Sequence, residues 1–334
     1  MRLENIVALT HGQLLNNPYV SSFNDIVFQA SLVKRGDLYV AYDTKEIPQA
    51  LANGAYAILF EKPCQITDSE LAWIKVQNLD EALFRLLRFR LVEQEVVAYE
   101  CDEITLQLAF GIDTAKQIAL FSGSVRFLIE QFWNIPKKTI VLFYPQEFQK
   151  GFFPNAMQFP TLTRYCIEII EKTLFETSFI FENVYYERFI LSPFFIPYLE
   201  KLLNFYKYLE IDYKLKKFEN LKNFEIVFTS KNFEENILGE SQMVLIFEQN
   251  PTLLSVEMEF LSRYAPWAKI LYILPYSFEA PKGYEYFVYK SKNEILQLLE
   301  ENFFHFAFIG GESKEFITYA KEKTKKQKQL TFGF

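Results

Sequence analysis

Short apolar runs alternate with helical segments at both ends of this chain, and this alternation restricts the fold more than any other feature. The first part, to about Ala98, has strand-like runs followed by a helix from Leu79 to about Leu91, whose leucines fall on one face. The last part, from about Gly239, repeats the pattern, beginning with a buried strand at Met243. Strands that alternate with helices predict an α/β fold with mostly parallel sheets.

The charge, cysteine and histidine content of the chain argues against several classes of protein function. The net charge is −7 and both signs are spread along the chain, which argues against a nucleic-acid binder because phosphate contacts need concentrated Lys and Arg. Three well-separated cysteines, Cys64, Cys101 and Cys166, fit reduced, buried thiols better than a disulfide framework or a zinc site. The chain has only two histidines, His11 and His305, so a histidine-based catalytic triad or metal site has few candidate residues.

The chain shows no sequence feature of membrane insertion or export. No window reaches the roughly 18 uninterrupted apolar residues that a membrane span needs, and the start M-R-L-E-N places both charge signs before any apolar run. We therefore expect a soluble, cytoplasmic protein. The one basic run, 321–334, ends in two aromatics, Phe332 and Phe334. It either packs back on the last domain or recruits a partner as a C-terminal peptide.

The stretch Ile118–Gln131 has the outline of a strand, a glycine turn and a helix start, which is the layout of a phosphate-binding loop. In such a loop, backbone N–H groups cradle phosphates, a lysine neutralises them and a hydroxyl holds magnesium. Here the glycine, lysine and hydroxyl places hold Arg126, Phe127 and Leu128. A phenyl ring cannot replace an ammonium group, and a leucine cannot ligate a hard cation. The stretch alone is an ordinary strand and helix, and the residues assigned to a degenerate nucleotide loop are Ser122, Gly123, Ser124 and Arg126.

Three segments of the first part carry a resemblance to a known family. The sequences V-K-R-G-D-L-Y-V-A at 33–41, I-P-Q-A-L-A-N-G-A-Y-A-I-L at 47–59 and W-I-K-V-Q-N-L-D-E-A-L at 73–83 resemble the N-terminal, UDP-sugar-binding domain of the Mur ligases. The similarity is greatest to the type that adds D-alanyl-D-alanine to the muramoyl tripeptide. The resemblance implies a UDP-sugar-like region that contains Lys34, Gly36 and Asp37.

The ligand-facing residues of that domain differ from the family pattern. The family's D-S-R, which meets the nucleotide sugar, corresponds here to Gln29, Ala30 and Ser31. The overall sequence pattern of the domain is retained, but the polar residues that contact the ligand in the family are absent.

The resemblance extends to the middle and the end of the chain. The sequence S-G-S-V at 122–125 matches the first four places of the family's T-G-S-V-G-K-T loop. The last part retains Asn250 and Pro251 of the family's D-x-Y-N-A-N-P signature, with Phe247 in the tyrosine's place and Glu248 in that of the first asparagine. These matches imply a three-domain, Mur-ligase-like α/β arrangement with a reduced central ATPase-like domain and a Rossmann-like C-terminal domain. The corresponding segments are 1–98, 99–238, 239–322 and a basic tail at 323–334.

Two local predictions concern the central and last parts. A helix expected at 161–173 would place Glu168 and Glu171 three residues apart, where we interpret them as a solvated face and not as a metal pair. Thr252 is expected to cap the helix that follows the Asn-Pro motif.

Three functional hypotheses remain open from the sequence. The first is a Mur-ligase-like protein without catalysis, which binds or scaffolds peptidoglycan-synthesis proteins and needs no cofactor, metal or catalytic residue. The second is an active ligase that uses ATP and magnesium at a rebuilt site, with Lys137 and Lys138 supplying charge. The third is an interaction protein recruited by its C-terminal peptide.

Overall fold

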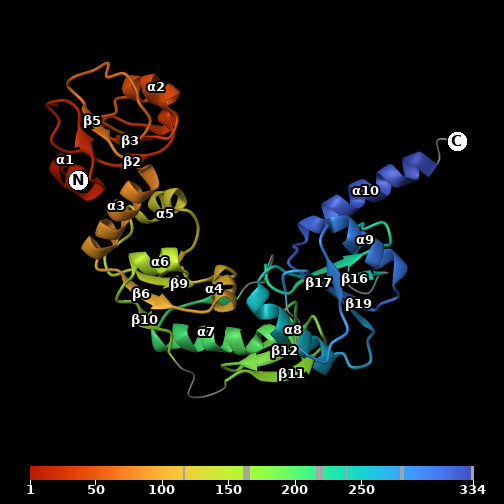
Figure 1. Cartoon of the computed structure of the whole chain (residues 1–334). Coiled ribbons are helices and arrows are strands. Elements are labelled where there is room, and N and C mark those ends of the chain that lie inside the picture. The colour runs from red at the N-terminus through yellow and green to blue at the C-terminus, as the bar shows by residue number, and fades with distance from the viewer. Residues whose placement is uncertain are drawn as a thin grey trace. The chain divides into compact units, whose positions relative to one another are not determined.

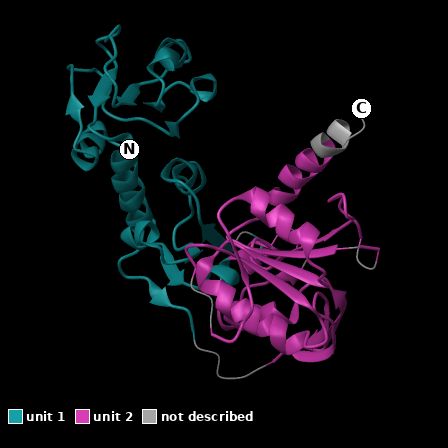
Figure 2. Ribbon diagram, turned by 45° about the vertical axis from the view of Figure 1, so that its right-hand side comes forward, with its two compact units in different colours: residues 1–106, 114–160 teal, residues 107–113, 161–334 magenta. Residues whose placement is uncertain are grey.

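The computed structural model of the chain describes residues 1–115, 117–160, 166–215, 218, 221–237, 240–241, 243–278 and 282–331. The chain divides into two compact units, coloured separately in Figure 2. Unit 1 contains residues 1–106 and 114–160, and unit 2 contains residues 107–113 and 161–334. Each unit has its own sheets and helices (Figure 1).

The first sheet of unit 1 has the strand order β1-β5-β4-β3-β2, with β2 to β5 parallel and β1 antiparallel at one edge. Its strands and their neighbouring helices are α1 (Leu3–Thr10), β1 (Gln13–Leu14), β2 (Ile26–Val27), η1 (Ala30–Leu32), β3 (Leu38–Ala41), η2 (Thr44–Glu46), α2 (Ile47–Ala52), β4 (Ala57–Phe60), β5 (Ala72–Lys75) and α3 (Leu79–Glu93).

The central strands of this sheet are apolar because both of their faces are covered. Every residue of β3 and β4 is buried, as expected for parallel strands packed on two sides. Tyr39 and Trp73 belong to the core on one face, and Val40 and Ile74 belong to the core on the other. The predicted helix from Leu79 is confirmed, and Asn78 caps it by accepting a hydrogen bond from the backbone N–H of Glu81.

The second sheet of unit 1 has the strand order β10-β6-β9-β8, and its described pairs are all parallel. A single hydrophobic core joins it to the first sheet through side chains of α3 and of the helix after β8. The elements of this part are β6 (Val97–Glu100), β8 (Ile118–Phe121), α5 (Val125–Phe132), β9 (Ile140–Phe143), α6 (Glu147–Phe152) and β10 (Met157–Gln158).

Unit 2 begins with a short antiparallel sheet in the order β11-β12-β13, together with the helix α7. The helix predicted at 161–173 is wrong in its described portion, because Glu168–Lys172 forms the strand β11. The β-branched Ile169 and Ile170 favour this state, and pairing with β12 supplies the hydrogen bonds. The prediction for 161–165 lies outside the described residues.

The elements of this part of the chain are α4 (Glu103–Phe110), which crosses the boundary between the units, β7 (Ile112–Asp113), β11 (Glu168–Lys172), β12 (Thr177–Phe181), β13 (Val184–Phe189), η3 (Pro193–Phe195), α7 (Ile196–Tyr208) and β14 (Lys214–Leu215).

The C-terminal sheet of unit 2 has the order β15-β16-β19-β17-β18. Its pairs are parallel except for β15, which runs antiparallel along the edge of β16. The alternation predicted for this part of the sequence is therefore confirmed, and the chain is of the α/β class. The elements are β15 (Glu225–Thr229), β16 (Met243–Glu248), α8 (Pro251–Tyr264), β17 (Ile270–Pro275), β18 (Phe287–Tyr289), α9 (Lys292–Glu301), β19 (Phe306–Gly310) and α10 (Glu315–Thr331).

Two helix boundaries differ from the sequence prediction. The cap of α8 is Asn250, not Thr252, because the Asn250 side chain accepts the backbone N–H of Thr252 at 2.9 Å and Pro251 takes the first helical position. At the C-terminus, α10 continues to Thr331 through most of the expected basic tail. Phe332 and Phe334 lie outside the described residues. In the part of the chain that is described, no helix combines the length and the apolar character required of a membrane span.

Candidate functional site

The turn between β8 and α5 is the place where the sequence predicts a nucleotide loop. Gly123 has φ +125°, which a side chain would strain, and Ser124 caps the helix. The Ser124 hydroxyl accepts the backbone N–H of Phe127 at 3.4 Å, and its carbonyl accepts that of Leu128 at 2.9 Å. The predicted order of strand, glycine turn and helix is present. The backbone N–H groups of Phe127 and Leu128, in the first turn of the helix, donate hydrogen bonds to Ser124.

The two positions after Arg126 carry apolar groups at this turn. A Cβ atom placed on Gly123 would lie 2.8 Å from Cδ1 of Phe127, so the phenyl ring lies against the glycine. The Leu128 side chain is fully buried in the core of unit 1. The half-exposed Phe127 ring therefore lies beside Gly123, and the Leu128 side chain points into the core.

Arg126 turns its guanidinium toward the first sheet. Its Cζ lies 5.4 Å from the ring centroid of Phe28 and 5.8 Å from that of Tyr42, and its Nε lies 3.4 Å from a carboxylate oxygen of Glu130. The Tyr42 hydroxyl donates to Asp80 at 2.6 Å. Burial and this bond to Asp80 raise the pKa of Tyr42 well above its usual value. We call Phe28, Tyr42, Asp80, Arg126 and Glu130 the Arg126 cluster.

The Arg126 cluster lies at the carboxyl edge of the first parallel sheet. Phe28 follows β2, Tyr42 follows β3, and Asp80 is in the first turn of α3, which follows β5. Open α/β sheets bind ligands at this edge. Sequence reasoning found Arg126 and missed Phe28 and Tyr42, although each directly follows a strand, which is a readable signal.

Lys34, Gly36 and Asp37 lie at the opposite, amino end of β3. They form a tight turn in which the Asp37 carboxylate accepts the backbone N–H of Lys34 at 2.9 Å. Gly36 has φ +99°, and Asp37 is buried. These contacts give the three residues a role in shaping the turn, and they are separated from the Arg126 cluster by the length of the strand.

The turn between β16 and α8 holds the C-terminal motif and a buried carboxylate. Glu248 accepts the backbone N–H of Asn250 at 2.6 Å, the backbone N–H of Phe224 at 3.0 Å and the side-chain amide of Asn223 at 3.2 Å. Glu248 is fully buried, as is Glu257 of α8. Sequence reasoning named Asn250 and Pro251 and did not identify a carboxyl pair.

Glu257 lies beside Glu248 in this buried site. Neither carboxyl oxygen of Glu257 receives an N–H or O–H donor from the described residues. Burial, and then the adjacent Glu248, raise the pKa of Glu257 well above its usual value. Burial also raises the pKa of Glu248, and its three N–H donors offset part of that rise. The readable signal was a glutamate on the apolar face of α8, between Leu254 and Leu261.

Comparison with known proteins identifies the fold of this chain by structure and not by sequence. No protein-family model matches the chain, and no curated protein matches its sequence. MurF from Acinetobacter baumannii matches at a TM-score of 0.54 with 10% identity, over 96% of this chain and 98% of that one. The MurF ligase from Thermotoga maritima, solved in complex with ADP, matches at 0.53 with 11% identity, over 91% and 98%. This chain has the Mur-ligase fold.

A third structure supports the same assignment. The UDP-N-acetylmuramoylalanyl-D-glutamyl-2,6-diaminopimelate–D-alanyl-D-alanyl ligase from Acinetobacter baumannii matches at a TM-score of 0.51 with 11% identity, over 96% and 98% of the chains. At this identity the likeness shows the Mur-ligase fold alone.

Within this Mur-ligase fold, the predicted site residues belong to separate places. Arg126 and its loop lie beside the first sheet of unit 1, whereas Asn250 and Pro251 open a helix of unit 2. Among the described residues, no three His, Cys, Asp or Glu side chains converge as a metal site would require.

Proposed function

We propose that this chain is a MurF-type protein without a functional phosphate-binding loop, which acts as a non-catalytic binding or scaffolding protein beside peptidoglycan precursor synthesis. One observation carries the proposal. At the turn after β8, the Phe127 ring lies against Gly123 and the Leu128 side chain is buried in the core. The expected compartment is the cytoplasm, the expected partners are proteins of peptidoglycan synthesis, and no ATP or magnesium is expected to bind.

Electrostatics gives the physical reason. A ligase that activates a carboxylate with ATP must hold several phosphate charges and at least one magnesium ion in a preorganised site. A phenyl ring and a buried leucine supply neither a cation nor a metal ligand. The one cation of the loop, Arg126, is engaged by Glu130 and by two aromatic rings. The residues of this loop do not fit a nucleotide phosphate group.

The positions of Lys137 and Lys138 favour this proposal over a rebuilt nucleotide site. Strands β8 and β9 are parallel, with Ile118 opposite Ile140 and Phe121 opposite Phe143. The loop follows Phe121, whereas the two lysines precede β9 at the amino edge of the same sheet. Four strand residues separate the two edges by roughly 13 Å. The lysines therefore have no direct route to phosphates at the turn after β8.

Binding and turnover assays test the proposal on the full chain. ATP with magnesium is titrated by calorimetry, and ATP-dependent joining of D-alanyl-D-alanine to a UDP-muramoyl tripeptide is followed by product analysis. The Thermotoga maritima MurF ligase serves as the positive control. We expect no saturable ATP binding and no product from this chain under conditions in which the control turns over.

Two outcomes would overturn the proposal. One is ligation product above the no-enzyme background. The other is magnesium-dependent ATP binding that an Arg126→Ala variant abolishes and a Lys137→Ala variant retains, since this would place the nucleotide at the turn after β8.

A further inference from the structure

The outer edge of β15 leaves main-chain hydrogen-bonding groups open. In an antiparallel strand, the N–H and C=O of one residue point to the same side, and successive residues alternate. The Phe228 carbonyl accepts the N–H of Asn236, and the Ser230 N–H donates to the Glu234 carbonyl. The N–H and C=O groups of the even-numbered residues therefore point away from β16. Ile226 has the same parity. Its N–H and C=O therefore point outward, and the described part of the chain provides neither with a hydrogen-bond partner.

A cavity of about 290 Å³ lies along this edge. Its floor is the strand from Glu225 to Phe228, and its lining combines apolar side chains, Phe175, Leu191, Phe195 and Leu221 among them, with polar ones such as Asn236 and Lys314. All of these residues belong to unit 2. A cavity with an unpaired strand edge on one side and apolar side chains in its walls has the features of a strand-addition groove.

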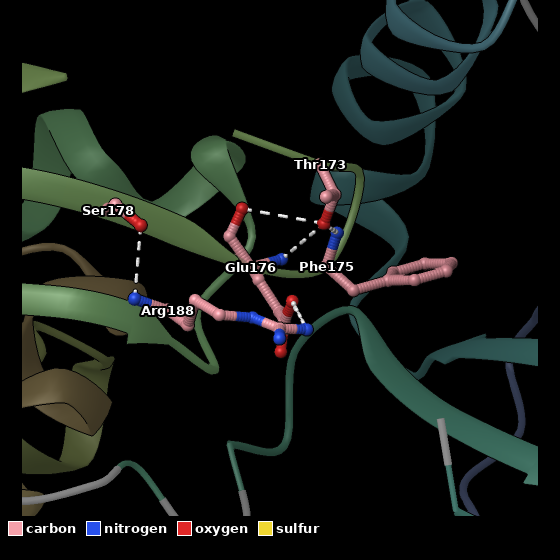
Figure 3. A network of polar contacts seen from close by, with 5 residues as sticks. All are labelled: Thr173, Phe175, Glu176, Ser178 and Arg188. Carbon is pink, nitrogen blue, oxygen red and sulfur yellow. Dashed lines mark hydrogen bonds and ion pairs between the residues drawn. The ribbon is translucent and has the colours of Figure 1, made fainter. Parts of the chain in front are cut away.

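The wall at Phe175 is fixed by the turn that precedes β12. The Thr173 hydroxyl accepts the N–H of Phe175 at 3.2 Å and that of Glu176 at 2.9 Å, and Glu176 pairs with Arg188 at 3.2 Å. Figure 3 shows the Phe175 ring pointing away from this polar network. The ring contacts those of Phe228 and Phe306, with centroids 5.4 Å and 5.7 Å apart. These contacts hold the Phe175 wall of the groove in place.

Charges at the rim are balanced. Lys314 lies 3.3 Å from Glu225, and Lys321 lies 3.6 Å from Glu235. A charged side chain entering the groove would lose hydration without gaining an unpaired opposite charge. The volume is just below the range of about 300–1,000 Å³ usual for ligand pockets, so only a few residues fit.

We infer that this groove binds a short, extended and uncharged stretch of another polypeptide, two or three residues long, which adds as a strand to β15. The main-chain groups of Ile226 form two hydrogen bonds with the central residue of the peptide. The apolar walls receive its side chain. This binding uses no nucleotide, so it stands or falls separately from the function proposed above.

The test uses the full chain and a defined peptide, an N-acetylated, C-amidated Ala-Val-Ala. Binding is followed by the amide signals of ¹⁵N-labelled protein, and we expect a saturable shift at Ile226. The same peptide with an N-methyl group on its valine cannot donate the central hydrogen bond. We expect the methylated peptide to bind at least about tenfold more weakly, because that hydrogen bond is lost and the methyl group adds bulk.

A matched pair of variants tests the protein side. An Ile226→Pro change removes the outward N–H, and proline is tolerated on an edge strand when that N–H does not serve the ladder. An Ile226→Val change keeps the N–H. We expect binding to be lost by at least about tenfold in the first variant and kept in the second.

Equal affinity for the methylated and unmethylated peptides would overturn the inference, and this result needs no variant to fold. Absence of any saturable shift with the unmethylated peptide would overturn it as well.

Discussion

Two turns of this molecule share one layout and use it in different ways. Each follows a parallel strand and leads into a helix: Ser122–Ser124 joins β8 to α5, and Gln249–Asn250 joins β16 to α8. At the first, the half-exposed Phe127 ring lies against Gly123, and the adjacent Leu128 is buried. The second is tied by a buried carboxylate that accepts three hydrogen bonds.

The difference teaches that the layout by itself decides no chemistry. A strand followed by a tight turn and a helix N-terminus creates a place where anions can bind. In the first turn, the Phe127 ring lies against Gly123 and the Leu128 side chain is buried in the core. In the second, the buried Glu248 carboxylate accepts the N–H of Asn250 in the turn together with donors from Asn223 and Phe224, so the turn is stabilised internally.

The largest expected effect comes from removing Glu248. A Glu248→Ala change leaves the N–H groups of Phe224 and Asn250 and the amide of Asn223 without their acceptor in a buried site. Each buried donor left without its acceptor costs about 1–3 kcal/mol, so we expect a total loss of about 3 kcal/mol or more. Urea unfolding of the full chain, followed by fluorescence, measures the change. The control is Glu259→Ala, on the exposed face of the same helix, with an expected effect below about 0.5 kcal/mol. Similar midpoints for the two variants would contradict the assigned role of Glu248.

The next effect concerns pH and the raised pKa of Glu257. Above about pH 4.5 the unfolded Glu257 loses its proton, whereas the folded chain retains it because the folded pKa is raised. The folded state then binds more protons, so stability falls as pH rises, by about 1.4 kcal/mol per pH unit, until the folded pKa is passed. The raised pKa of Glu248 acts in the same direction.

A Glu257→Gln variant should flatten that pH dependence. The amide of glutamine does not titrate and can still donate to Glu248. We therefore expect the variant to be more stable than the parent chain at pH 7 and to differ less from it at pH 5, measured as urea midpoints across this range. A Glu259→Gln variant should retain the slope of the parent. An unchanged slope in Glu257→Gln would show that the proton is not held at Glu257.

The smallest effect compares the two helix caps. Asn250 accepts the backbone N–H of Thr252 at 2.9 Å and its hydroxyl at 2.8 Å, whereas Ser124 accepts a single N–H at 3.4 Å. We expect Asn250→Ala to lower stability by about 1 kcal/mol, and Ser124→Ala by less than about half of that. Thermal unfolding of both variants under one condition provides the comparison. An equal or larger loss in Ser124→Ala would mean that the turn after β8 relies on its cap more than its geometry indicates.

Local sequence patterns determined the α/β class and most of the elements. Buried strands such as 57–60 and 243–248 and the leucine face of α3 could be predicted because hydrophobic periodicity is a local property. The same patterns predicted a helix after the Asn-Pro motif, but they placed its cap at Thr252 instead of Asn250. They also predicted a helix where β11 lies, because a short apolar run with charges fits either state until a neighbouring strand supplies its hydrogen bonds.

Tertiary structure alone decided which side chains meet. Arg126 approaches Phe28 and Tyr42, which are distant in the chain, and Glu257 is buried beside Glu248. The outward direction of the Ile226 backbone groups depends on strand pairing. Sequence fixes local conformational preference, because that depends on neighbouring residues. Burial, pKa and the pairing of a backbone group depend on what folding brings beside them, and no local pattern contains that information.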